Sequence, residues 1–175
     1  MAKRYRCNTS HGQKIENYAL QIFDAMKKFH GLGTRERLLL QIASILHDCG
    51  KFISLRDSSA CAYNIIMATE IIGLSHAERE IVAEVVRCNL DAFRYGEGSI
   101  RAGKLTAMLR LANAMDRSHH GRLDDGKLQV KGNKLIISTS YAGNLALETM
   151  AVEDKADFFE EMFGIRPEIR QKRRV

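Results

Sequence analysis

An acidic side chain falls on the apolar side of a predicted helix in the second half of the chain. Between positions 100 and 119 apolar residues recur at helical spacing, and Asp116 follows Leu109 by seven positions and Ala112 by four. A carboxylate that points into a protein interior is unfavourable unless a cation, hydrogen-bond donors or a metal ion meets it. Asp116 therefore predicts a polar partner inside a helical core.

Two other segments would bring polar groups to the same core. His47 and Asp48 stand at the end of an apolar helical pattern that begins after Thr34, and His11 opens an earlier one. Imidazole nitrogens and carboxylate oxygens together suit a divalent ion such as Mn, Mg, Fe or Zn. The predicted metal ligands are His11, His47, Asp48 and Asp116, converging on one ion. Even without metal, Asp116 is expected to lie near His47.

Each of these residues also has a purely structural explanation. His47 and Asp48 could form a hydrogen-bonded pair at a helix end that Gly50 caps. His11 could lie at the surface or be a satisfied core histidine, and Lys51 could simply complement the helix dipole. The metal site is favoured because inward-pointing polar groups on three helices are hard to satisfy without one another.

Such a site has a defined chemistry. A metal ion lowers the pKa of bound water, which can then attack phosphorus, and the ion neutralises phosphate charge. Asp48 would hold the metal and orient the water, while Lys51 would place an ammonium on a phosphoryl oxygen. These two are the candidate catalytic residues. The candidate substrate-binding residues are Lys51, ranked first, with Asn89, Arg87, Arg110 and Arg117.

The same segments resemble a known family. A histidine, a later His-Asp doublet and a final aspartate on helices resemble the HD superfamily of metal-dependent phosphohydrolases. The segments 4–7, 10–11, 29–32, 37–40, 45–53, 73–75 and 109–119 are more closely similar to the C-terminal module of the exopolyphosphatase and guanosine pentaphosphate phosphatase family. The resemblance covers nearly the whole chain. It implies an HD-type helical fold and a phosphatase of polyphosphate or phosphorylated nucleotides.

The chain departs from that family in two ways. Positions that usually carry further histidines hold Ala60 and Asn89, so no second metal is expected, and nothing matches the Gly-rich phosphate loops of the family's preceding ATPase-like domains. Two functions therefore stay open. One is a one-metal phosphohydrolase. The other is a non-catalytic module that binds polyphosphate or forms a homodimer.

The predicted fold is mainly α. An HD-type helical bundle is expected over 1–120, with helices over about 10–29, 34–50, 59–72, 76–90 and 100–119, and a small α+β subdomain over 121–175. Gly132 and Asn133 predict a hairpin between 128–130 and 135–139. Residues 144–151 fit a helix or a strand. Residues 152–163 fit a helix, and 165–169 a short edge strand because of Pro167.

The bulk composition limits the partners. A net charge of +6 favours anions such as phosphate chains or nucleotides, while no aromatic-rich strand supports nucleic-acid readout. No apolar run of membrane-spanning length and no signal peptide are found, so a cytoplasmic protein without membrane contact is expected. The four widely spaced cysteines are expected to be reduced.

Overall fold

The computed structural model describes residues 1–175 except 3, 6, 8, 94–98 and 173–175. Its helices are α1 (Thr9–Ala25), α2 (Lys27–His30), α3 (Thr34–Leu46), the short 3-10 helix η1 (Cys49–Phe52), α4 (Ser58–Ala68), α5 (His76–Cys88), α6 (Ile100–Met115) and α7 (Ala146–Phe163). One sheet contains β1 (Lys127–Lys131), β2 (Lys134–Thr139) and β3 (Arg166–Gln171). The expected fold, mainly α with a small α+β part at the C-terminal end, is confirmed.

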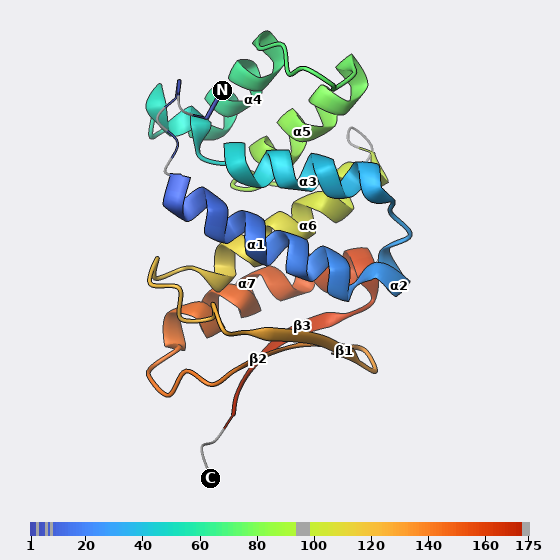
Figure 1. The fold of residues 1–175 in the computed structure, drawn as a ribbon, viewed down its shortest axis with the longest axis vertical. Helices are drawn as coiled ribbons and strands as arrows, with labels where there is room; N and C mark the ends of the chain where they lie inside the picture. The colour runs from blue at the N-terminus through green and yellow to red at the C-terminus, as the bar shows by residue number, and fades with distance from the viewer. Residues whose placement is uncertain (3, 6, 8, 94–98, 173–175) are drawn as a thin grey trace.

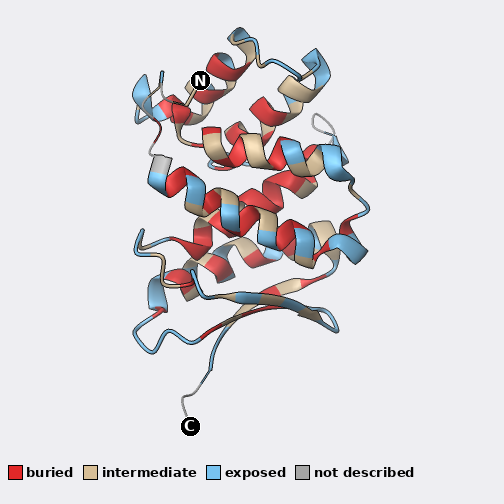
Figure 2. Ribbon diagram, viewed as in Figure 1, coloured by how far each residue is buried: buried red, intermediate tan, exposed pale blue. Residues whose placement is uncertain are grey.

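Helix α6 is the central element of the molecule. It packs against α1, α3, α5 and α7, and Figure 1 shows α4 and α5 at one end of the fold and the sheet beyond α7 at the other. Residues on most sides of α6 are buried, among them Leu105, Leu109 and Ala112. Helix α6 is accordingly largely red in Figure 2. Any polar group at the end of α6 is therefore carried into the interior.

The C-terminal part forms a hairpin followed by a crossover. Strands β1 and β2 pair in antiparallel fashion, and Gly132, at a φ of 60°, makes the turn between Lys131 and Lys134. Strand β3 lies parallel to β2, which requires a crossover that α7 supplies. Since β3 is an edge strand, Pro167 can stand in it. The hairpin and the edge strand are both confirmed.

Several helices differ in length from the expected ones. The first predicted helix is split into α1 and α2, where the buried ring of His30 folds back to the carbonyl of Phe23. The second ends at Leu46, and η1 follows it. Helix α4 ends at Ala68 because Thr69 takes an extended conformation. Residues 146–151 belong to α7, whose first turns bury the side chain of Glu148.

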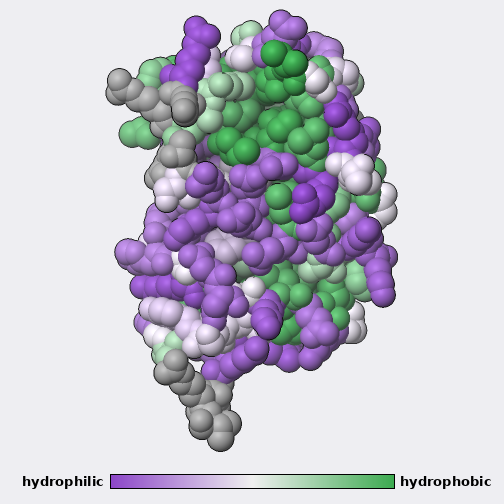
Figure 3. Space-filling model, viewed as in Figure 1, coloured by the Kyte–Doolittle hydropathy of each residue, from purple (hydrophilic) through white to green (hydrophobic). Residues whose placement is uncertain are grey.

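The molecular surface is mixed. Figure 3 shows apolar residues gathered over α4 and the adjoining parts of α3 and α5, and hydrophilic residues over much of the remaining visible face. All four cysteines are free thiols. Within the described ranges of the chain, no helix has the length and apolar character needed to cross a bilayer.

The buried ring of His30 predicts a pH-dependent stability. Its Nδ1 accepts a hydrogen bond from the Leu32 amide at 2.8 Å, so Nε2 carries the proton and donates to the Phe23 carbonyl at 3.0 Å. Burial lowers the pKa of His30. The stabilisation by the neutral ring is therefore complete above the unfolded-state pKa of about 6.5 and declines as the pH falls. Urea unfolding at pH 7.5 and 5.5 should show a smaller pH-dependent loss in His30→Gln than in the wild type. Equal losses would contradict this role.

Candidate metal centre

Five polar side chains meet where helix α1 begins and helices α3 and α6 end. His11 lies in the first turns of α1, His47 and Asp48 follow α3 directly, Asp116 follows α6, and His119 comes three residues later. The packing of α1 against both α3 and α6 brings these three helix ends together. We call His11, His47, Asp48, Asp116 and His119 the five-residue cluster.

Asp116 is satisfied by two groups within the interior. Its Oδ2 lies 3.1 Å from Nδ1 of His11, and its Oδ1 accepts a hydrogen bond from the Gly121 amide at 3.0 Å. Burial alone would raise the pKa of Asp116, but these hydrogen bonds outweigh it and lower the pKa, which keeps the carboxylate charged. The direct partner of Asp116 is thus His11, whose ring lies 5.2 Å from that of the expected neighbour His47.

His47 carries a buried ring nitrogen that makes no hydrogen bond. Its Nδ1 lies 2.6 Å from the carbonyl oxygen of Ser44, to which it donates, so the neutral ring carries a lone pair on Nε2. Nε2 is buried and has no hydrogen-bond partner. Burial also lowers the pKa of His47, which favours the neutral form. A neutral imidazole whose other nitrogen donates to a carbonyl is the form in which histidine binds metal ions.

Asp48 faces that lone pair. Its Oδ1 lies 3.4 Å from Nε2 of His47 and 2.7 Å from Nζ of Lys51. Burial would raise the pKa of Asp48, but the neighbouring ring of His47 and the ammonium of Lys51, which also donates a hydrogen bond, lower it. An ionised carboxylate therefore faces an imidazole lone pair, and a cation between them would stabilise both.

His119 completes the cluster and was not among the predicted ligands. Its Nδ1 lies 3.1 Å from Nδ1 of His11, although its own ring is exposed. His119 has a φ of 58°, the left-handed conformation that non-glycine residues adopt at a cost in free energy. Its position three residues beyond Asp116 is the sequence feature that could have pointed to it.

The ligand atoms form two overlapping groups. Those of His11, His47 and Asp48 lie within 4.8 Å of one another, as do those of His11, Asp116 and His119. His11 belongs to both groups. The structure therefore gathers the four predicted ligands in one cluster, but neither group holds all four. Their mixed nitrogen and oxygen donors, with the unpaired Nε2 of His47, fit a divalent ion.

The predicted substrate-binding residues divide into separate places. Lys51 is half-exposed beside Asp48, at the solvent side of the cluster. Arg87 is engaged elsewhere, because its Nη2 lies 2.7 Å from Oε1 of Glu84 and its guanidinium stands over the ring of Tyr63. The other three residues, Asn89, Arg110 and Arg117, line a hollow of about 510 Å³ to which no member of the five-residue cluster contributes.

The two positions that usually carry histidines in the resembled family lie in α4 and at the end of α5. Ala60 is an exposed residue of α4, and Asn89 caps the end of α5 and lines the hollow. Among the described residues, neither belongs to a group that could hold a metal.

Comparison with known proteins places the chain in a family. Residues 1–154 match the family model described as Ppx/GppA phosphatase, domain III. The chain belongs to the Ppx/GppA phosphatase family. The match confirms the resemblance to the C-terminal module of that family and makes this a phosphatase-related protein.

A curated relative supports the assignment to the Ppx/GppA family. Over 157 residues the chain is 24% identical to a guanosine-5'-triphosphate,3'-diphosphate pyrophosphatase of Photobacterium profundum. The aligned region covers 86% of this chain and 32% of the relative. The chain thus spans about a third of the length of that Ppx/GppA protein.

Proposed function

We propose that this domain is a metal-dependent phosphohydrolase acting on phosphate-bearing anions, either polyphosphate or a phosphorylated nucleotide. The observation that carries the proposal is the buried, unpaired Nε2 of His47, which faces the Asp48 carboxylate beside His11. Burying a polar atom without a partner is unfavourable, and a bound cation would remove that cost.

The residues of the cluster divide the work. His11, His47 and Asp48 would hold the ion, with Asp116 and His119 on the other side of His11. When bound, a divalent ion supplies water activation and neutralises phosphate charge. Asp48, which is partly exposed, can take a proton from the attacking water. The ammonium of Lys51, which pairs with Asp48, can bind a phosphoryl oxygen of the substrate instead.

Phosphate release tests this proposal. With Mn²⁺ added to chelator-treated protein, we expect turnover of tripolyphosphate or ATP, and a loss of at least about 100-fold in Asp48→Asn, because the variant loses a ligand and a proton acceptor. Asp157→Asn is the matched control, since Asp157 is exposed on α7, where it pairs with Arg166. Metal-stimulated turnover that survives Asp48→Asn unchanged would refute the proposed site.

A second function has its own support. The Lys51 ammonium already neutralises Asp48, and the chain matches one domain and a third of the length of its relative. It can therefore serve as a binding module of a larger phosphatase. In that case polyphosphate binds without turnover, and the affinity falls steeply with added salt because binding releases counterions from the polyanion.

A further inference from the structure

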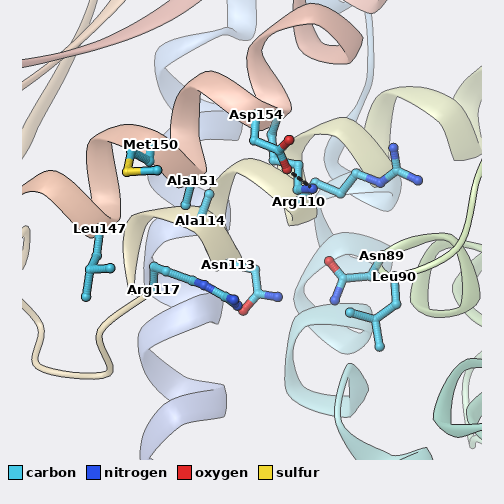
Figure 4. Close-up of a pocket in the computed structure, with 11 residues that line it drawn as sticks. Asn89, Leu90, Arg110, Asn113, Ala114, Arg117, Leu147, Met150, Ala151 and Asp154 are labelled. Carbon is cyan, nitrogen blue, oxygen red and sulfur yellow. Dashed lines mark hydrogen bonds and ion pairs between the residues drawn. The ribbon is translucent and has the colours of Figure 1, made fainter. Parts of the chain in front are cut away.

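The hollow lined by Asn89, Arg110 and Arg117 lies beside α6. It is formed by the end of α5, the last turns of α6 and the first half of α7, and has a volume of about 510 Å³ (Figure 4). Its lining residues are Asn89, Leu90, Arg110, Asn113, Ala114, Arg117, Leu147, Met150, Ala151, Asp154 and Lys155. Because no residue of the five-residue cluster lines it, a ligand here would occupy a site of its own.

Charge in the hollow favours an anion. Among the lining residues that the structure describes, three are cations, Arg110, Arg117 and Lys155, and one is a carboxylate, Asp154. Lys155 and Asp154 form an ion pair at 2.5 Å. The guanidinium of Arg117 is exposed and makes no hydrogen bond or ion pair with any residue that the structure describes. Arg117 attracts Asp154 electrostatically without forming a hydrogen bond or ion pair with it, so Arg117 can bind an anion without giving up either kind of contact.

Arg110 contributes a fixed positive charge to the wall. Its Nε donates to the carbonyl of Cys88 at 2.8 Å and its Nη2 to the carbonyl of Asp91 at 2.5 Å. Its guanidinium also lies over the ring of Phe158, 4.6 Å from the centroid. These contacts hold Arg110 at the end of α5, so it adds to the local potential while Arg117 is left to contact the ligand.

Asn89 adds an unsatisfied hydrogen-bonding group. The residue is 6% exposed, and its Oδ1 is buried without a partner. Figure 4 shows its side chain pointing into the hollow toward Asn113, a second amide. Buried amide oxygens are nearly always hydrogen-bonded, so the structure leaves a place here for a donor from a ligand.

The remaining wall is apolar. Leu147 and Met150 of α7 are 54% and 68% exposed, and Leu90 faces them from the end of α5. Such side chains make no favourable contact with a bare phosphate chain, because that chain is hydrated along its length. They suit a planar organic ring, and methionine in particular packs favourably against aromatic rings.

We propose that this hollow binds an organic phosphate, in which anionic phosphate groups are attached to a planar ring with hydrogen-bonding groups, the chemistry of a nucleoside phosphate. Arg117 and Lys155 bind the phosphates, and the apolar side chains of Leu147 and Met150 cover the planar ring. Asn89 accepts a hydrogen bond from it. The site functions without the metal centre, so it adds a ligand beyond the proposed phosphohydrolase reaction.

Calorimetric titrations in the presence of EDTA test this site separately from metal chemistry. ATP should bind at least about 10-fold more tightly than tripolyphosphate, which lacks the planar ring, and than adenosine, which lacks the phosphates. Equal affinity for tripolyphosphate and ATP would show a general polyanion surface instead. An absence of ATP binding would overturn the proposal.

Three variants and one control locate the ligand. Arg117→Gln should weaken ATP binding by about 10-fold, whereas Asp154→Asn should tighten it by removing a carboxylate from the wall of the hollow. His11→Ala should leave it unchanged. Lys131→Gln removes one exposed positive charge from β1, outside the hollow. The proposal fails if Lys131→Gln weakens binding as much as Arg117→Gln does, or if His11→Ala abolishes it.

Discussion

His11→Ala is expected to raise the Kd for Mn²⁺ by at least about 100-fold, more than loss of an outer-shell partner typically does. His11 is the residue that both ligand groups share, and its Nδ1 lies 3.1 Å from both Asp116 and His119. Removing it breaks up both groups at once. His119→Ala removes one member of a single group, and we expect a smaller loss. Isothermal titration of chelator-treated protein with MnCl₂ would measure both.

A matched control exists for this pair of histidine variants. His76 is exposed at the start of α5 and contacts Arg79, away from the five-residue cluster. His76→Ala should therefore bind Mn²⁺ as the wild type does. If His11→Ala were no more damaging than His119→Ala, the two ligand groups would not share a residue in the bound state, and the assigned geometry would be wrong.

Gly50→Ala is expected to destabilise the fold by about 3 kcal/mol, at the upper end for overpacking a tight site. A Cβ at Gly50 would lie 1.8 Å from the backbone oxygen of Ser58 and 2.7 Å from the amide nitrogen of Ala62. Both atoms belong to the backbone of α4, so no side chain can move aside. Helix α4 and η1 would have to separate, which also displaces Asp48.

Urea denaturation measures this effect, and Gly12→Ala is its control. A Cβ at Gly12 would meet its nearest neighbour at 3.7 Å, an ordinary contact, within helix α1. Alanine is favoured over glycine in a helix by up to about 1 kcal/mol, so Gly12→Ala should be neutral or stabilising. If Gly50→Ala unfolded at the same urea concentration as Gly12→Ala, the close packing of η1 on α4 would be incorrect.

The sequence predicted most of the helices because their apolar periodicity and end signals are local. Gly132 marked the hairpin and Pro167 the edge strand for the same reason. Asp116 could be placed inside because α6, which precedes it, is buried on most sides. The apolar periodicity identifies which face of a helix is buried, and a central helix such as α6 is covered by its neighbours on that face.

The pairing of particular side chains could not be predicted in this way. That Asp116 contacts His11, with His47 next to it, depends on how far α1 is shifted along α3 and α6. His119 enters the cluster through a left-handed residue in a turn, and no periodicity extends into a turn. Arg87 was assigned to substrate, yet it is held by Glu84, a partner one helical turn away on α5.

Metal content measures the central claim most directly. Protein purified without chelator or a metal-affinity tag, dialysed against MnCl₂ and then against metal-free buffer, would be analysed by elemental mass spectrometry. We predict one equivalent of Mn²⁺ per chain in the wild type, and only background levels in the double variant of His11→Ala and His47→Ala. Background metal in the wild type, or an equal metal content in the double variant, would contradict the assignment of this cluster as a metal centre.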